Sequence, residues 1–270
     1  MSSSHAIPQG LHFVANSPVA GLAVAERRVE SPLATVICIH GGLDRGGSFA
    51  RLARRMELFD LVAYDRRGYQ GSRDLGPLGL EYDVDDLLTL AYHEAKKGPV
   101  IFFGHSFGGV VALGAALKEA SLVQQVIVFE APLPWVRYRE SSRSILSNDP
   151  EYEAETFFRR MVSNSAWERL SDLEKHSRRL DGPALYSDLT LLRTGATPFD
   201  LAQLEVPTLY AHGDVNHLEY YQSLCRDLRE LSPLIDTREL EKVGHGAHLS
   251  HPDLLASLVL STWRERCVLE

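Results

Sequence analysis

The residue of this 270-residue sequence best placed for chemistry is a serine set between glycines. Ser106 lies in the segment GHSFGG (residues 104–109), which follows the apolar run 100–103 and precedes a helical pattern. A tight strand-to-helix turn projects such a serine oxygen above a sheet, and the flanking glycines allow the strained backbone and close packing of that turn. The start of the helix directs free N–H groups at negative charge developing on a substrate. The segment therefore predicts a nucleophilic serine.

A general base for this serine is expected near the C-terminus. The segment GHGAHL (residues 244–249) falls between the last predicted strand and the last predicted helix. A histidine on such a loop can reach over the sheet and take the serine proton. The candidates are His245, His248 and His251.

A glycine pair follows the first long apolar strand, in the segment HGGL (residues 40–43). A loop there could direct a backbone N–H at the same site. An ordinary turn at the end of a strand explains the glycine pair equally well.

The elements that must position these residues are short apolar runs alternating with helical patterns. The runs lack polar alternation, as strands of a parallel sheet covered on both faces do. After an opening hairpin (12–15 and 21–29), strands are predicted at 35–39, 61–64, 100–103, 126–129, 208–211 and 236–240. Helices are predicted at 48–57, 83–97, 106–119, 218–231 and 252–264.

This alternation is interrupted between Glu130 and Thr208. The interval shows two helical patterns, 151–164 and 167–180, and a connection this long predicts a helical insertion rather than a loop. We therefore expect a core domain of residues 1–132 and 202–270, with residues 133–201 forming a helical cap over the ends of the sheet.

Four motifs in this order resemble the α/β-hydrolase superfamily: HGG (40–42), YDRRGYQGS (64–72), GHSFGG (104–109), and GH (244–245) followed by Pro252. The resemblance implies an α/β fold with a mostly parallel eight-stranded sheet, helices on both faces and a cap inserted after strand 6. It implies Ser106 as nucleophile and His245 as base. It also implies an oxyanion hole formed by the N–H groups of Phe107 and Gly42, or Leu43, and gives residues 65–68 a structural role.

The acid of the catalytic triad departs from the common family pattern. The family usually places an aspartate three residues after the glycine that stands here as Gly213, but that position holds Asn216. A subset of the superfamily takes its acid from the end of the preceding strand, where this chain has Glu130, and a charge ending a buried strand needs a partner. We predict Glu130 as the acid, with Asp214 as the alternative.

These residues predict a serine hydrolase, carboxylesterase- or thioesterase-like, that cleaves a small or medium ester, thioester or related carbonyl substrate through an acyl-enzyme on Ser106. Leu43, Leu133 and Trp135 are predicted to line the substrate pocket. Carbon–carbon bond hydrolysis and cofactor-free perhydrolysis use the same residues and stay open as alternatives. A non-catalytic ligand receptor or interaction protein on the same fold is a further alternative, because position 216 lacks an acid.

Composition restricts the partners. The chain carries 28 Lys and Arg against 36 Asp and Glu, a net charge of −8, which disfavours nucleic acid and anionic membranes. No signal peptide, membrane span or metal-ligand spacing is found, and three dispersed cysteines are typical of a reducing compartment. We expect a cytoplasmic monomer or homodimer without metal or cofactor, acting on a small molecule. Leu269 and Glu270 are candidates for a vector remnant.

Overall fold

Eight strands form one sheet in the computed structural model, which describes residues 10–138 and 146–267. Their bounds are β1 (His12–Phe13), β2 (Val24–Arg27), β3 (Thr35–Ile39), β4 (Asp60–Tyr64), β5 (Val100–His105), β6 (Gln125–Phe129), β7 (Thr208–Gly213) and β8 (Ile235–Leu240). The strand order is β1-β2-β4-β3-β5-β6-β7-β8. β1 and β2 form the predicted opening hairpin, and β2 is also antiparallel to β4. All later pairs are parallel, so the predicted fold class is confirmed.

Helices cover both faces of the sheet, which is why the central strands are apolar on both sides. One apolar core joins the sheet to α2 (Leu80–Ala95), α3 (Phe107–Lys118) and α8 (Leu218–Leu231). The opposite core joins it to η1 (Gly46–Phe49), α1 (Ala50–Ala53), α9 (Ala247–Ser250) and α10 (Pro252–Cys267). Short 3-10 turns lie at η2 (Gln70–Leu75), η3 (Ala120–Leu122) and η5 (Leu201–Gln203). No helix of the described residues combines the length and hydrophobicity needed to span a bilayer.

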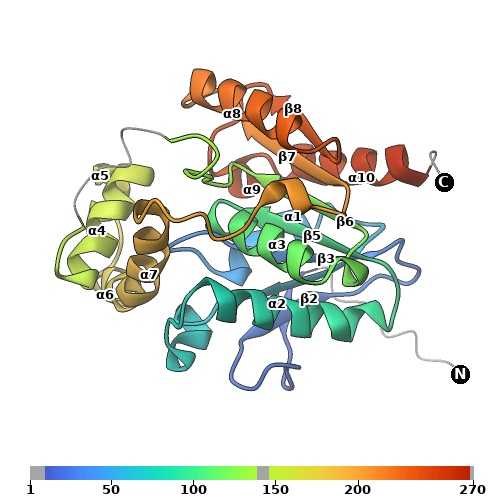
Figure 1. Ribbon diagram of the computed structural model, residues 1–270. Coiled ribbons are helices and arrows are strands. Elements are labelled where there is room, and N and C mark those ends of the chain that lie inside the picture. The colour runs from blue at the N-terminus through green and yellow to red at the C-terminus, as the bar shows by residue number, and fades with distance from the viewer. Residues whose placement is uncertain (1–9, 139–145, 268–270) are drawn as a thin grey trace, which may run out of the picture.

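Four helices of the described residues lie between β6 and β7: α4 (Pro150–Met161), α5 (Asn164–Glu168), α6 (Asp172–Leu180) and α7 (Gly182–Arg193). We call these helices the insertion. Figure 1 shows them grouped beyond one end of the sheet, away from both termini. Their own apolar core includes Trp167, Leu185 and Leu189, and Leu43 of the main domain packs into it. The division at residues 133 and 201 stays a prediction.

Helix boundaries depart from the sequence-based expectation in three places. The predicted helix 167–180 is two helices, because Ser171 and Glu174 form a capping box that begins α6. Helix α7 was not predicted, although Pro183 in its first turn is a helix-start signal. The predicted helix 48–57 is only η1 and the four-residue α1.

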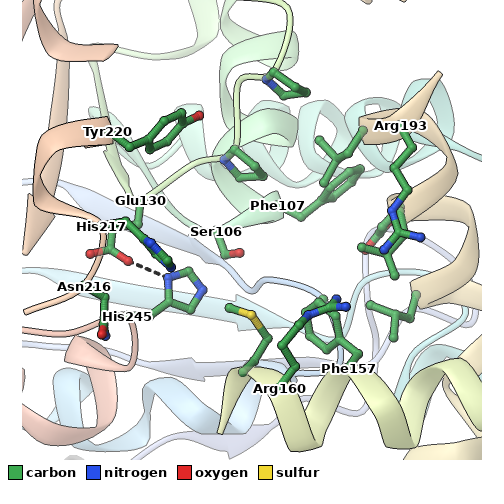
Figure 2. A pocket seen from close by; sticks show the side chains of 18 of the residues that line it. Ser106, Phe107, Glu130, Phe157, Arg160, Arg193, Asn216, His217, Tyr220 and His245 are labelled. Carbon is green, nitrogen blue, oxygen red and sulfur yellow. Dashed lines mark hydrogen bonds and ion pairs between the residues drawn. The ribbon is translucent and has the colours of Figure 1, made fainter. Parts of the chain in front are cut away.

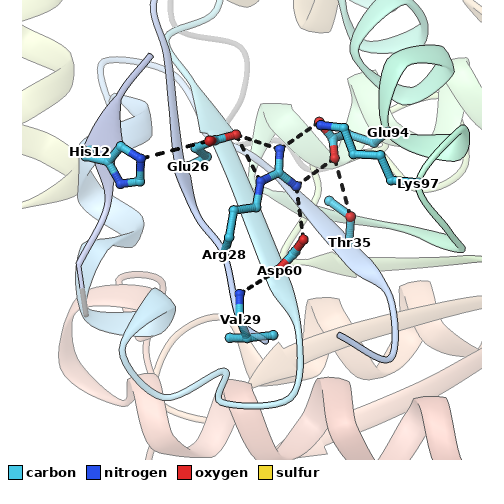
Figure 3. Close-up of polar contacts among 8 residues, drawn as sticks. All are labelled: His12, Glu26, Arg28, Val29, Thr35, Asp60, Glu94 and Lys97. Carbon is cyan, nitrogen blue, oxygen red and sulfur yellow. Dashed lines mark hydrogen bonds and ion pairs between the residues drawn. The ribbon is translucent and has the colours of Figure 1, made fainter. Parts of the chain in front are cut away.

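A cluster of charged side chains lies at the end of the strands remote from Ser106. Asp60 of this cluster begins β4, whereas Ser106 follows the end of the strand β5, which runs in the same direction. The Arg28 guanidinium, next to β2, lies 2.6 Å from a Glu26 oxygen, 3.2 Å from Asp60 and 2.7 Å from Glu94 (Figure 3). Three carboxylates around one cation thus join β2, β4 and α2 far from the site.

The packing of α3 on β3 requires a glycine at position 108. A Cβ there would lie 2.1 Å from the Ile39 carbonyl oxygen, a backbone atom that cannot move aside. We expect Gly108→Ala to lower the free energy of unfolding by about 3 kcal/mol in urea denaturation, because the helix must shift off the strand.

The matched control is Gly47→Ala, where a Cβ meets nothing within 4 Å. Its effect should stay within about 1 kcal/mol. Equal stability of the two variants would contradict the packing argument.

Candidate active site

Ser106 lies on a strained turn between β5 and α3. Its backbone has φ 53° and ψ −127°, outside the regions that non-glycine residues prefer. Two hydrogen bonds hold the turn: Ser106 N–H donates to the Phe129 carbonyl at 2.9 Å, and Gly109 N–H donates to the Ser106 carbonyl at 2.8 Å. A Cβ on Gly104 would lie 2.5 Å from the Gly109 Cα, so the glycines permit the close crossing of strand and helix.

The loop after β3 approaches Ser106 closely. A Cβ on Gly41 would lie 2.7 Å from the Ser106 Cβ. His40 supports this loop: its Nε2 accepts from the Arg66 N–H at 2.9 Å, and its Nδ1 lies 2.7 Å from the Gly41 carbonyl oxygen. Burial, aided by the charge of Arg66, lowers the pKa of His40 to about 3, so the ring is neutral and Nδ1–H donates to Gly41. His40 thereby fixes the loop that presents Gly42.

Glu130 and His245 form a hydrogen-bonded pair. Glu130 directly follows β6, is 3% exposed and has a positive φ of 50°. Its Oε2 lies 2.6 Å from His245 Nδ1, and Figure 2 shows the contact as a dashed line. The Gly213 N–H donates to Oε1 at 3.0 Å and the Tyr221 hydroxyl donates to Oε2 at 3.3 Å. Because a carboxylate only accepts, Nδ1 carries the proton and Nε2 is left as the basic nitrogen.

The alternative acid, Asp214, is not the partner of His245. No ion pair joins the two residues within the described chain, and Asp214 Oδ1 is buried there without a hydrogen-bond partner. Asn216, at the position where the family usually has its acid, lines the same cavity as His245. The structure thus brings Glu130, and not Asp214, to the histidine.

Ser106, Glu130 and His245 line one end of a cavity of about 640 Å³, a volume typical of small-molecule sites (Figure 2). No hydrogen bond joins Ser106 Oγ to the His245 ring, although both residues are described. Such contacts are often long before substrate binds. The rest of the lining comes from Gly42, Phe107, Pro132, Pro134, Asn216, His217, Tyr220 and Tyr221, and from residues of the insertion: Phe157, Arg160, Met161, Val162, Leu185, Asp188, Leu189, Leu192 and Arg193.

The residues predicted for the substrate pocket, Leu43, Leu133 and Trp135, do not line this cavity, and the prediction is corrected. Leu133 is fully buried in the core, while Pro132 and Pro134 on either side of it face the cavity. Leu43 packs into the insertion core, and Trp135 lies edge-on to Phe199 at 5.4 Å between ring centres. Their neighbours in sequence line the cavity instead.

A buried guanidinium connects the elements around Ser106. Arg66 is fully buried and lies 2.6 Å from Asp188 Oδ2 of the insertion and 3.1 Å from Asp83 Oδ2 of α2. Its Nε–H donates to the His40 carbonyl at 3.0 Å, and its plane lies 4.9 Å from the Phe107 ring centre. The segment 65–68 therefore has the structural role expected of it, and Asp188 is a partner that sequence reasoning missed because α7 was not predicted.

His105 contacts His245 and also lies against His248. The His105 Nε2 lies 2.8 Å from the His245 carbonyl oxygen, and burial together with neighbouring His248 and His245 lowers the pKa of His105 well below its usual value. The ring is therefore neutral and supports the His245 loop through an N–H donor. Asp44, His105 and His248 are also the one set of described residues whose geometry could hold a metal ion, with ligand atoms within 4.8 Å of one another. Asp44 Oδ2 already lies 3.2 Å from His248 Nε2.

Comparison with known proteins adds a family and a set of relatives. The model of a family described as "Alpha/beta hydrolase family" matches residues 36–258. Lipase LipV of Mycobacterium tuberculosis is 29% identical over 136 residues, which cover 50% of this chain and 51% of that protein. The chain thus spans about half the length of this relative.

Solved structures share the fold over almost the entire chain. An esterase from Thermogutta terrifontis has a TM-score of 0.66 at 18% identity and covers 94% of this chain and 98% of its own. A bacterial membrane phospholipase A has a TM-score of 0.70 at 18% identity, and the match covers 95% of this chain and 87% of the phospholipase chain. The TM-scores show a shared fold, and at 18% identity the similarity shows the fold alone.

The buried pair of Arg66 and Asp188 should be costly to break. We expect Asp188→Asn to lower the free energy of unfolding by about 3 kcal/mol, because a buried guanidinium loses the charge nearest to it.

The partly exposed pair of Arg137 and Asp227, 2.5 Å apart, supplies the control. Asp227→Asn should cost less than about 1 kcal/mol in the same urea titration. A loss for Asp188→Asn no larger than that of the control would show that the buried pair does not hold the insertion in place.

Proposed function

The chain belongs to the alpha/beta hydrolase family, and we propose that it is a serine hydrolase acting on a small or medium ester, thioester or related carbonyl compound. The observation that carries the proposal is the 2.6 Å contact of a buried carboxylate, Glu130, with His245 Nδ1 in the same cavity as Ser106. An oriented histidine beside a serine on a strained turn is the arrangement that nucleophilic catalysis requires.

In the proposed reaction, Ser106 Oγ attacks the substrate carbonyl carbon while His245 Nε2 takes the hydroxyl proton. Glu130 stabilises the imidazolium that forms. The imidazolium then gives its proton to the departing alcohol or thiol, and an acyl-enzyme remains on Ser106. Water, deprotonated by His245, attacks the acyl carbon and releases the acid and the free serine.

The oxyanion of each tetrahedral intermediate would be held by backbone N–H groups. Phe107 is the first residue of α3, so its N–H has no partner within the helix. Gly42 lines the cavity on the loop that packs against Ser106. We assign the oxyanion hole to these two N–H groups, where preorganised donors favour the charged intermediate over the substrate.

Cavity and relatives agree with an ester-type substrate. The cavity of about 640 Å³ has room for a small or medium acyl group, and most of the insertion residues that line it are apolar. The names of the relatives, a lipase, an esterase and a phospholipase, support ester cleavage.

Labelling with a fluorescent fluorophosphonate tests whether Ser106 is an activated nucleophile. We expect the wild-type protein to be labelled and Ser106→Ala to stay unlabelled on a denaturing gel, because the probe bonds covalently to serines that a base activates. Ser121→Ala, which removes an exposed hydroxyl outside the cavity, should label like the wild type. An unlabelled wild type, or equal labelling of Ser106→Ala, would exclude the serine mechanism.

Turnover of p-nitrophenyl butyrate tests the choice of acid. We expect Glu130→Gln to lower kcat roughly a thousandfold or more, since an amide can neither stabilise the imidazolium nor enforce the right tautomer. Asp214→Asn should stay within a few-fold of the wild type. Thermal unfolding of both variants controls for misfolding. The opposite pattern, with Asp214→Asn inactive and Glu130→Gln active, would transfer the role to Asp214.

A further inference from the structure

The insertion places two cationic side chains on an otherwise mostly apolar wall of the cavity. Arg160 comes from α4 and Arg193 from the last residue of α7, and both line the cavity that contains Ser106 (Figure 2). The other lining residues of the insertion are mainly apolar, such as Phe157 and Leu189.

Neither arginine is neutralised by an acid of the cavity wall. The acidic lining residues are Glu130 and Asp188. Glu130 accepts from His245, and Asp188 is paired with the buried Arg66. Both carboxylates of the lining are thus held by other residues, and neither is placed to pair with Arg160 or Arg193.

The two arginines also lack close acidic partners elsewhere in the described chain. Arg193 Nη1 is buried without a hydrogen-bond partner, and its Nη2 lies 3.9 Å from Glu153, at the limit of an ion pair. Arg160 makes no ion pair within these residues and lies over the Phe157 ring at 5.5 Å.

A neighbouring arginine of the insertion shows the usual arrangement. Arg159 lies 2.7 Å from both Glu155 and Glu168. Arg159, which does not line the cavity, is thus closely paired with acids, whereas Arg160 and Arg193, which line it, are not.

We infer that the cavity selects substrates carrying an oxyanion, a carboxylate or a phosphate, at a distance from the carbonyl that reacts, and that Arg160 and Arg193 bind this group. A guanidinium matches the geometry of both anions through paired N–H donors, and the low polarity of the wall strengthens the contact. This inference rests on the proposed hydrolase function and specifies its substrate class.

Two pairs of compounds test the inference and distinguish where the anion lies. Mono-p-nitrophenyl adipate against p-nitrophenyl hexanoate places a carboxylate on the acyl side. Hexanoyl-coenzyme A against S-hexanoyl-N-acetylcysteamine places phosphates on the leaving-group side. For the wild type we expect kcat/KM to be about tenfold or more higher for the anionic member of at least one pair.

Variants connect this preference to the arginines. Arg193→Met and Arg160→Met should each reduce the ratio of anionic to neutral kcat/KM, and the exposed Arg160 gives a variant with little risk to folding. Arg159→Met, which removes the neighbouring paired arginine, should keep the wild-type ratio.

Hydrolysis of both members of each pair at equal kcat/KM would overturn the inference and leave the proposed function standing. A preference for the anionic compound that both Met variants retain would also overturn the inference and leave the proposed function standing. If none of the four compounds were hydrolysed, the result would contradict the hydrolase function and the inference that rests on it.

Discussion

A buried carboxylate at the end of β6 is the constraint around which the site is built, because a negative charge removed from water must be met by donors from the surrounding elements. At Glu130 these donors are the Gly213 N–H at the end of β7, the Tyr221 hydroxyl on α8 and Nδ1 of His245 after β8. Segments that follow one another in sequence thus converge on one side chain. The convergence fixes the tautomer and the orientation of the His245 ring, as the proposed role of a base requires.

A second buried charge, of opposite sign, organises the other half of the site. Arg66 holds the loop after β3 through His40, packs over Phe107 at the start of α3, and anchors the insertion through Asp188. The positions of the expected oxyanion donors and of the cavity wall therefore depend on the same guanidinium. Glu130 and Asp188 are both engaged in these networks, so neither carboxylate pairs with the arginines of the cavity wall.

Sequence alone predicted the fold class, because buried parallel strands lack polar alternation and the glycines around Ser106 mark a strand-to-helix turn. It favoured Glu130 as the acid but left Asp214 as an alternative, since both follow neighbouring parallel strands whose ends meet at one edge of the sheet, and only atomic distances separate them. The pocket prediction failed for Leu133 because tertiary packing decides which residue of an irregular segment faces a cavity. The lining residues of α7 were missed because that helix was not predicted, although Pro183 was an available signal.

Proton NMR of histidine-labelled protein observes the hydrogen bond between Glu130 and His245 directly and without substrate. A short N–H···O contact to a buried carboxylate moves the proton resonance far downfield. We expect one such proton, coupled to Nδ1 of His245, in the wild-type protein and its loss in Glu130→Gln. An unchanged downfield proton in that variant, or its absence from the wild type, would contradict the assignment of Glu130 as the residue that orients the base.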